Sequence, residues 1–424
     1  MTEFKTLEEV EDYLTTYSNN QRLRSGPNKL NKTKRLMKLV ENPQKKLRII
    51  HVAGTSGKTS TSTYLSKLLS LNNLSVGLTI SPHLDILTER VQINNIPLPT
   101  KTFLKEFSIF LGLIKKSKDE YGYFEILFAF ALYYFHKIKV DYVIVETGVG
   151  GLLDSTNVIT NADKVVTITD IGLDHTNLLG NTISKIAYQK VGIMHHDNHL
   201  IMFKQSNIVM QVIESYSKQQ GGYIHYAKYF RLNRKDKTLY SRLAYYQQKN
   251  WMLAYNVLNY LAKRDAFKIQ NKEIISKSLK YQISGRMDLI ELKNKKILLD
   301  GAHNNQKIRA LLNSFKKLYP NQKAVFLVAF KKDKDFKKII NQMIPYASKI
   351  IITQFNFKWD YHILSVDPRT IQKFLIKRQF SNYSIQMDQK RAFQELLNDP
   401  NNLKIVTGSL YLISQIRALN NYAE

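Results

Sequence analysis

Short apolar runs alternate with helical patterns over the first half of the chain. Five runs rich in Ile, Val and Leu have the length and composition of buried strands, at residues 47–52, 76–80, 140–145, 165–169 and 200–203. Between them, residues 60–71 and 124–135 place apolar side chains at helical spacing. Because strands that alternate with helices pair in parallel, this order predicts a mainly parallel sheet covered by helices on both faces.

The segments outside this alternation predict further parts. Residues 1 to about 45 have helical spacing, and residues 222–246 are polar and predict a small antiparallel excursion before a helix over 250–261. Four more apolar runs follow residue 284, at residues 296–300, 324–328, 350–352 and 405–406. They predict a second, smaller α/β domain, so we expect two domains, residues 1–284 and residues 285–424.

A glycine-rich turn lies between the first strand and its helix. Residues 53–60 read Ala-Gly-Thr-Ser-Gly-Lys-Thr-Ser, which is typical of a phosphate-binding loop in a strand–loop–helix unit. Lys58 would reach the β- and γ-phosphates, and the Thr59 hydroxyl would coordinate Mg²⁺. The general pattern has a further glycine where Val52 stands, so an ordinary turn is the alternative. The residues expected to bind the phosphates are Gly54, Thr55, Ser56, Gly57, Lys58, Thr59 and Ser60.

Composition narrows the class of protein. The chain has no cysteine, which excludes disulfides and thiolate metal sites. No run of 18 apolar residues is present and the first residues lack the apolar core of a signal peptide, so we expect no membrane span and a cytoplasmic location.

The formal net charge of +29 admits three interpretations. It is compatible with solvated basic faces, with nucleic-acid binding, or with attraction of a polyanionic small molecule. The basic residues are spread along the chain in short clusters, and no zinc-finger spacing or long basic tail is present. A basic, nucleotide-gated nucleic-acid-binding protein therefore stays as an alternative of a different class, but nucleic acid is not the partner we favour.

Four polar side chains follow the ends of predicted strands and form a candidate metal site. They are Thr59, Ser81, Glu146 and His175. Hard oxygen ligands with one imidazole suit Mg²⁺ or Mn²⁺ better than zinc. Each residue also has a structural explanation, since Glu146 would serve as a helix cap, His175 as a buried core residue and Ser81 as the start of a turn. Their shared edge favours a site, because open α/β sheets bind ligands at the carboxyl ends of their strands.

Short motifs are spread over nearly the whole chain, at residues 51–60, 81–84, 89–91, 124–125, 146–157 (ETGVGGLLDSTN), 174–175, 179–182, 190–193, 285–286, 299–304 (LDGAHN) and 407–412 (TGSLYL). In order and spacing they resemble the motifs of the Mur ligase superfamily and, within it, of the folylpolyglutamate synthases and dihydrofolate synthases. The resemblance implies a P-loop ATPase-like N-terminal domain with a mainly parallel sheet and a smaller Rossmann-like C-terminal domain. It also implies a monomer that works on small molecules.

The implied activity is that of an ATP-dependent amide ligase. A carboxylate receives the γ-phosphate of ATP, and the amino group of glutamate then displaces phosphate from the acyl phosphate. The implied acceptor is a folate, with dihydropteroate as a further acceptor. Two Mg²⁺ ions are implied, one near Thr59 and Glu146 and one held by Ser81, Glu146 and His175. Lys190 aligns with a lysine that the family carbamylates.

The resemblance also assigns roles to individual residues. Those implied in catalysis are Lys58, His175, Lys190, Asp300 and His303. The nucleotide would also contact Asn250, Arg286 and Asp300, and the other substrates would contact Pro82, His83, His303 and Ser409. The second domain would close over the first about a hinge near residues 281–290 and exclude water that would hydrolyse the acyl phosphate.

The chain departs from the family pattern at four places. Ser56 replaces the Asn of the family's loop and Thr59 replaces the Gly that follows its Lys, which brings the loop closer to that of the peptidoglycan ligases. Leu152 stands at an Arg position, Gln189 replaces a Glu and Asn305 replaces a Pro. A related ligase that acts on another carboxylate, such as a peptidoglycan precursor, is therefore the alternative within the superfamily.

Overall fold

The computed structural model describes residues 3–19, 27–115, 117–270, 273–292, 295–358 and 362–421. The chain divides into two compact units. The first contains Met1–Leu243 and Gln247–Tyr281, and the second contains Ala244–Tyr246 and Gln282–Glu424. No helix among the described residues is long and apolar enough to cross a membrane.

Eight described strands of the first unit form one sheet. They are β1 (Ile49–Ala53), β2 (Val76–Thr79), β3 (Gln92–Ile93), β4 (Ile96–Pro97), β5 (Tyr142–Glu146), β6 (Val165–Ile168), β7 (His199–Met202) and β8 (Tyr223–Tyr226). Their order is β4-β3-β2-β5-β1-β6-β7-β8. β3 pairs antiparallel with both β2 and β4, and the other neighbouring strands of this sheet pair in parallel. The predicted mainly parallel sheet is confirmed, and each of its five predicted strands begins and ends within two residues of the expected bounds.

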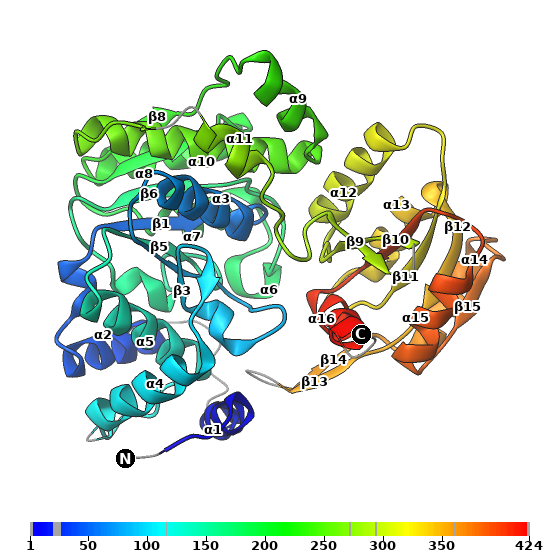
Figure 1. Cartoon of the computed structure of the whole chain (residues 1–424), viewed down its shortest axis with the longest axis horizontal. Helices are drawn as coiled ribbons and strands as arrows, with labels where there is room; N and C mark the ends of the chain where they lie inside the picture. Colours follow the sequence, from blue (N-terminus) through cyan, green and yellow to red (C-terminus); the bar gives the residue numbers. More distant parts are fainter. Residues whose placement is uncertain are drawn as a thin grey trace. The chain divides into compact units, whose positions relative to one another are not determined.

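Helices cover both faces of this sheet (Figure 1). Their bounds are α1 (Leu7–Asn19), α2 (Pro27–Leu39), α3 (Lys58–Leu71), α4 (Thr100–Ile114), α5 (Tyr123–Lys137), α6 (Thr176–Leu179), α7 (Ile183–Val191), α8 (Asn207–Gln219), α9 (Arg234–Arg242), α10 (Tyr245–Arg264) and α11 (Glu273–Leu279). Short 3₁₀ turns lie at η1 (Pro43–Lys46), η2 (Leu87–Arg90) and η3 (Ser155–Val158). Phe103 and Phe107 on α4 pack edge-on against Phe130 on α5, with ring centroids 5.1 and 5.2 Å apart. This apolar cluster includes Val143 and Val145 of β5, so it fixes the strand that ends at Glu146.

The second unit has a six-stranded sheet within its described residues. Its strands are β9 (Asp288–Leu292), β10 (Lys295–Asp300), β11 (Ala324–Val328), β12 (Ala347–Ile352), β15 (Tyr383–Ile385) and β16 (Lys404–Thr407), and β13 (Asn356–Lys358) pairs separately with β14 (His362–Leu364). The order of this sheet is β15-β12-β11-β16-β10-β9. Among these six described strands, β9 pairs antiparallel with β10 and the others pair in parallel. Its helices are α12 (Asn305–Leu318), α13 (Phe336–Met343), the turn η4 (Ile344–Tyr346), α14 (Pro368–Lys377), α15 (Gln389–Asn398) and α16 (Leu410–Asn421).

The predicted antiparallel excursion at residues 222–246 is wrong. β8 pairs with β7 in parallel, and Arg234–Arg242 form α9. Because α8 connects β7 to β8, the chain returns to the same end of the sheet before β8 begins, which requires parallel pairing. α9 begins where the Asn233 side chain accepts the N–H of Asp236, a cap that we did not recognise in this polar segment.

Candidate active site

The loop between β1 and α3 has a glycine near each of its ends, at Gly54 and Gly57. Gly54 has a φ of +153°, and Gly57, which precedes α3, has a φ of +95°. A Cβ at Gly54 would lie 1.8 Å from Thr169 Oγ1, and a Cβ at Gly57 would lie 2.4 Å from Asn250 Oδ1. Both positions therefore require glycine, and Asn250, which we expected at the nucleotide, contacts the loop itself.

The carbonyl of Asp170 holds the middle of this loop. Asp170 follows β6, and its carbonyl oxygen accepts the N–H groups of Thr55 and Ser56 at 2.8 and 3.2 Å. The Thr55 hydroxyl donates to Gly172 O at 2.9 Å. The amides of Thr55 and Ser56 thus maintain the loop, and the N–H groups at the start of α3 remain to meet a phosphate.

Two lysine side chains converge on one carbonyl oxygen of the loop. Lys58 Nζ donates to Gly54 O at 3.1 Å, and Lys190 Nζ, from α7, donates to the same oxygen at 2.8 Å. Lys190 is only 4% exposed. Both amines share one acceptor oxygen, so positive charges on the two side chains would repel each other and attract an anion.

Glu146 and Thr59 form a polar pair beside these lysines. Glu146 ends β5 opposite Val52 of β1, and it is buried. Thr59 Oγ1, in the first turn of α3, donates to Glu146 Oε1 at 2.9 Å. A hydroxyl and a carboxylate at this distance are both oxygen donors of the kind that Mg²⁺ prefers.

The strand order places Ser81 and His175 at the same edge of the sheet. Ser81 follows β2, which pairs with β5, and His175 follows β6, which pairs with β1. His175 is exposed at the start of α6, and its Nε2 lies 4.0 Å from Asp174 Oδ2. Within the part of the chain that the structure describes, no group of three or more His, Cys, Asp and Glu side chains could hold a metal ion. The expected ligand set contains only two such residues, since its other members are hydroxyls.

The segment after Ser81 divides between surface and interior. Pro82 is exposed, whereas His83 is buried, and His83 Nδ1 accepts Arg90 Nε at 3.0 Å. Burial and the Arg90 charge hold the pKa of His83 well below its usual value, and burial raises the pKa of Glu11, 3.7 Å away, to about 7. The two side chains are therefore in contact as neutral groups below about pH 7 rather than as an ion pair.

In the second unit, Asp300 organises the loops at the carboxyl end of β10. Its Oδ2 accepts the Tyr246 hydroxyl at 2.6 Å and the N–H of Met287 at 2.9 Å, and its Oδ1 accepts the N–H of Ala302 at 2.9 Å. Burial raises the pKa of Asp300, although these hydrogen bonds and the nearby Arg286 oppose the shift. Asp300 pairs in register with Thr407, so the segments LDGAHN and TGSLYL meet at one edge of the sheet.

His303, Arg286 and Ser409 lie in these same loops. His303 Nδ1 lies 2.7 Å from Gly301 O, and its Nε2 lies 3.0 Å from Lys307 Nζ, so the imidazole donates to Gly301 and accepts from Lys307. Arg286 Nη1 donates to Gly285 O at 2.9 Å. Ser409 is buried, and its Oγ accepts the N–H of Tyr411 at 3.1 Å.

Comparison with known proteins decides the family. A family model described as "Dihydrofolate synthetase, C-terminal domain" matches residues 285–420. The dihydrofolate synthase/folylpolyglutamate synthase of Bacillus subtilis is 30% identical over 420 residues, which cover 92% of this chain and 94% of that protein. The chain belongs to the dihydrofolate synthase/folylpolyglutamate synthase family. The dihydrofolate synthetase of Saccharomyces cerevisiae is 29% identical over 91% of this chain and 97% of that protein.

A solved structure shares the fold. The folylpolyglutamate synthase of Mycobacterium tuberculosis, complexed with ADP, matches with a TM-score of 0.82 over 97% of this chain and 98% of that chain, at 23% identity. The expected fold class, a phosphate-loop domain with a mainly parallel sheet and a smaller α/β domain, is therefore confirmed.

One departure from the family pattern now has a location. Leu152, at the family's Arg position, donates its N–H to Gln189 O at 2.6 Å, and a Cβ at Gly192 would lie 2.5 Å from Leu152 Cβ. The loop after β5 is thus fastened to the end of α7, beside Lys190. An apolar residue fits this tight contact.

Two residues that the sequence did not single out hold the phosphate loop indirectly. Lys249 Nζ lies 2.5 Å from Asp170 Oδ1, and Gln205 binds the backbone on both sides of Asp170. Lys249 adjoins Asn250 in the chain, and this adjacency was the one available signal.

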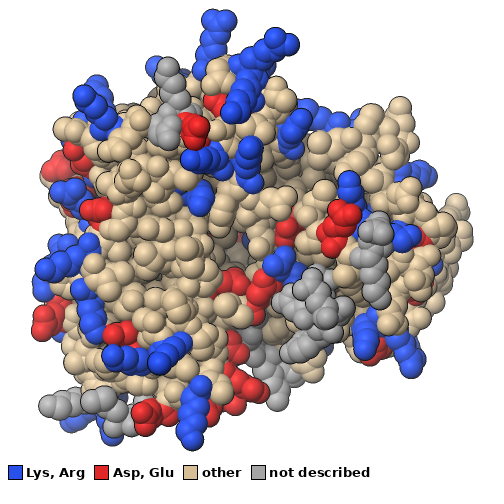
Figure 2. Space-filling view, viewed as in Figure 1, with Lys and Arg blue, Asp and Glu red and all other residues tan. Residues whose placement is uncertain are grey.

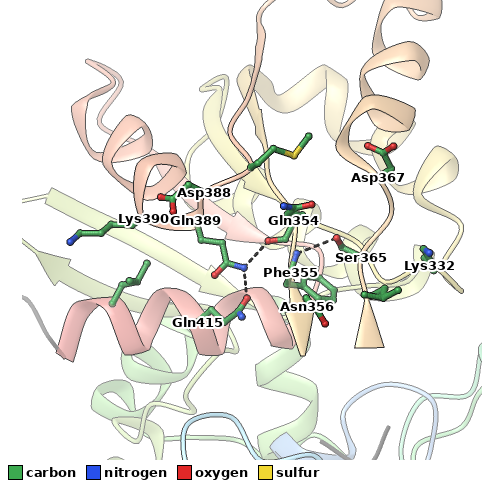
Figure 3. A pocket seen from close by; sticks show the side chains of 13 residues that line it. Lys332, Gln354, Phe355, Asn356, Ser365, Asp367, Asp388, Gln389, Lys390 and Gln415 are labelled. Carbon is green, nitrogen blue, oxygen red and sulfur yellow. Dashed lines mark hydrogen bonds between the residues drawn. The ribbon is translucent and has the colours of Figure 1, made fainter. Parts of the chain in front are cut away.

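A cavity of about 650 Å³ lies in the second unit, apart from the residues predicted for the site. Gln389 projects between Gln354 and Gln415, as Figure 3 shows, and donates to Gln354 O at 2.7 Å. Lys332 and Lys390 also line the cavity. None of the residues that we predicted to be functional is among its lining residues.

Proposed function

We propose that this protein is a Mg·ATP-dependent ligase that adds L-glutamate to a folate through an acyl phosphate, with dihydropteroate as a second acceptor. The observation on which the proposal rests is the contact between the phosphate-type loop and Glu146. Lys58 lies in this loop, and the residue after it, Thr59, donates a hydrogen bond to the buried Glu146. These groups supply the charge and the oxygen ligands that phosphoryl transfer requires.

The proposed reaction has two steps. A carboxylate oxygen of the folate attacks the γ-phosphorus of ATP, the bond to the β-phosphate oxygen breaks, and ADP leaves. The amino nitrogen of glutamate then attacks the acyl carbon, phosphate leaves and the nitrogen loses a proton. Lys58 and the N-terminus of α3 would stabilise the negative charge on the phosphates during the first step.

We propose two Mg²⁺ sites at this edge. Thr59 and Glu146 would hold one ion, and Ser81, Glu146 and His175 would hold the other. The donor set fits, because it consists of hydroxyl and carboxylate oxygens with one imidazole. When bound, Mg²⁺ would neutralise phosphate charge. The hydrogen bond of 2.9 Å between Thr59 and Glu146 already holds these two oxygen ligands close to each other.

We also propose that Lys190 is carbamylated. Its burial and its approach to the oxygen that Lys58 contacts support the proposal, because a carbamate replaces a repelling cation by an anion. The neutral amine attacks the carbon of CO₂, a nitrogen–carbon bond forms and one proton leaves. A high-resolution electron-density map with bicarbonate present tests it, and a bare amine at Lys190 would count against it.

The remaining residues are assigned as follows. Asn250, Arg286 and Asp300 would contribute to nucleotide binding, His303 and Ser409 would contact the incoming amino acid or acceptor, and Asp300 and His303 would take part in catalysis. Pro82 would contact the acceptor directly, and the buried His83 would act by shaping that loop. We propose residues 1–284 as the ATP-binding domain, residues 285–424 as the ligase domain, and a cytoplasmic monomer, as the family resemblance implies.

A screen of ADP release tests the activity. Purified protein is incubated with MgATP, glutamate and one acceptor at a time, namely dihydropteroate, folates and muramoyl peptide precursors. We expect glutamate-dependent ADP release with the folates. Release only with muramoyl precursors would move the assignment to a peptidoglycan-type ligase, and no release with any acceptor would refute a ligase of this kind.

On the face that Figure 2 shows, the distribution of charge favours a small-molecule substrate over nucleic acid. Figure 2 shows that the Lys and Arg side chains in view are dispersed among acidic and uncharged ones on that face. A nucleic-acid interface gathers basic side chains on one face or along one groove.

A further inference from the structure

The turn that follows β6 supports the phosphate loop from one side. We define the Asp170 turn as Thr169–Gly172. Its backbone makes hydrogen bonds from Asp170 O to the N–H groups of Thr55 and Ser56, at 2.8 and 3.2 Å. The loop therefore takes its position from a segment more than 100 residues away in the chain, so any shift of the turn moves the loop.

Gln205 fixes the backbone of the Asp170 turn. Its side-chain Oε1 accepts the N–H of Ile171 at 2.8 Å, and its Nε2 donates to Thr169 O at 3.1 Å. One amide group thus binds the residues before and after Asp170. Because both contacts go to the backbone, they constrain the direction of the Asp170 carbonyl and not only its location.

Lys249 compensates the charge of the Asp170 side chain. Lys249 Nζ lies 2.5 Å from Asp170 Oδ1, and it also lies 5.8 Å from the centre of the Phe203 ring. Both side chains are about one-third exposed, at 32% and 35%. Asp170 places a carboxylate next to a loop that receives phosphates, so without Lys249 that carboxylate would repel a polyanionic nucleotide.

Helix α10 carries two neighbouring residues, Lys249 and Asn250, that contact opposite ends of the phosphate loop and its supporting turn. Lys249 contacts the Asp170 turn, and the next residue, Asn250, closes over Gly57 at the other end of the loop. A single helical turn therefore contacts both sides of the loop. This juxtaposition explains why a lysine at this position serves the loop without being part of it.

We propose that Lys249 and Gln205 are positioning residues for nucleotide binding, with Gln205 orienting the Asp170 carbonyl and Lys249 neutralising the Asp170 carboxylate. The inference rests on the proposed function, since it assumes that the loop binds ATP. It assigns no contact between either side chain and the nucleotide. Its distinctive consequence is that the effect of removing Lys249 depends on the Asp170 charge.

Calorimetric titration with MgATP on four proteins tests the charge role. The proteins are the unmodified chain, Lys249→Gln, Asp170→Asn and the double variant. We expect Lys249→Gln to weaken ATP binding about threefold to tenfold, because it leaves a carboxylate uncompensated at a partly screened site. In the Asp170→Asn background, the same substitution should change the affinity by less than about twofold. The loss in Lys249→Gln should also shrink at high salt.

Two further variants complete this design, a matched charge control and a test of Gln205. Lys263→Gln removes the same charge from an exposed position on α10 and should leave the affinity unchanged. Gln205→Ala removes both backbone contacts without changing the charge, and it should raise the KM for ATP while leaving the KM for folate and glutamate unchanged. Its loss of ATP affinity should not depend on salt.

The outcomes separate this inference from the proposed function. If the unmodified chain gives no ATP-binding heat, the phosphate-loop assignment itself fails. If the unmodified chain binds ATP and Lys58→Ala does not, the phosphate-loop assignment is supported, and the variants at Lys249, Asp170 and Gln205 then test the positioning roles. Equal weakening by Lys249→Gln in both backgrounds would mean that Lys249 contacts the phosphates directly, and no weakening in either would mean that it has no role; both results overturn the inference.

Discussion

The polar side chains at the carboxyl edges of the two sheets make different kinds of contact. In the first unit they join distant segments, since Thr59 reaches Glu146 across 87 residues and Lys190 reaches Gly54 across 136. In the second unit they mainly bind their own loops, as His303 does with Gly301 and Ser409 with Tyr411.

This difference suggests that the two edges contribute in different ways to ligand binding and to the stability of the loops. The first edge gathers an amine pair, a hydroxyl and a carboxylate around one loop, which is the composition of a ligand site. The second edge uses polar groups, among them the buried Asp300 and Ser409, to hold its loops in place. Removing a side chain of the first edge that is not buried, such as Lys58 or His175, should therefore lower activity and preserve stability, whereas removing the buried Asp300 should lower both.

The largest effect is expected at the first edge. Lys58→Ala should lower ATP turnover by about 10²–10³-fold or more, because it removes a positive charge that meets the transferred phosphate. The melting temperature should stay close to that of the unmodified chain, since within the described residues the Lys58 side chain has a single hydrogen bond, to Gly54 O. ADP release and thermal unfolding measure the two quantities. Retained turnover would refute the phosphate-loop assignment.

The second edge should respond in stability. Asp300→Ala leaves three donors without their acceptor, namely the Tyr246 hydroxyl and the N–H groups of Met287 and Ala302. We expect a loss of about 2–4 kcal/mol in the free energy of unfolding, by urea titration. Asp300→Asn keeps one acceptor oxygen and should lose less. An unchanged urea midpoint in Asp300→Ala would remove the contrast between the edges.

A metal titration sharpens the assignment of the first edge. His175→Ala should raise the Mg²⁺ concentration for half-maximal activity about tenfold, as expected for the loss of one ligand or its support. Because His175 is exposed, thermal stability should not change. His196→Ala, at another exposed histidine, is the matched control. Equal Mg²⁺ requirements in the two variants would exclude the ligand role of His175.

The smallest effect concerns pH and Glu11. The pKa of Glu11 is raised to about 7 in the folded chain, against about 4.3 for an unfolded glutamate. The folded state therefore keeps a proton between these values, and the stability that Glu11 contributes is present below about pH 4.3 and is lost as the pH rises toward 7.

The Glu11→Gln variant isolates this contribution. The free energy of unfolding of the unmodified chain, relative to Glu11→Gln, should fall by roughly 1–3 kcal/mol between pH 4.5 and 7, a range that allows for partial exposure. Denaturant unfolding across this range measures it, and Glu3→Gln, at an exposed glutamate outside α1, is the control. A difference that does not vary with pH would show that the carboxyl titrates normally.

Local patterns were sufficient to predict the first edge. The strand before Gly54, the helix after Gly57 and the strand ending at Glu146 all follow from β-branched runs, helical spacing and glycine position. Parallel pairing then places their ends together, because the carboxyl ends of parallel strands share an edge. Membership of the family, inferred from motifs, is confirmed.

Contacts between distant segments were not predictable in the same way. The sequence of residues 222–246 did not show that α8 returns the chain for parallel pairing of β8, since that depends on the connection and not on local composition. The Lys249–Asp170 pair joins residues 79 apart that have no motif of their own. The burial of His83 and its bond to Arg90 likewise depend on how α1 and α5 enclose that loop.

Transfer of labelled oxygen tests the central claim most directly. A folate acceptor with both oxygens of the reacting carboxylate replaced by ¹⁸O is turned over with MgATP and glutamate, and the phosphate is examined by mass spectrometry. The account predicts one ¹⁸O in each inorganic phosphate, because an acyl phosphate passes one carboxylate oxygen to the departing phosphate. Unlabelled phosphate, or label in AMP, would contradict transfer of the γ-phosphate to the carboxylate.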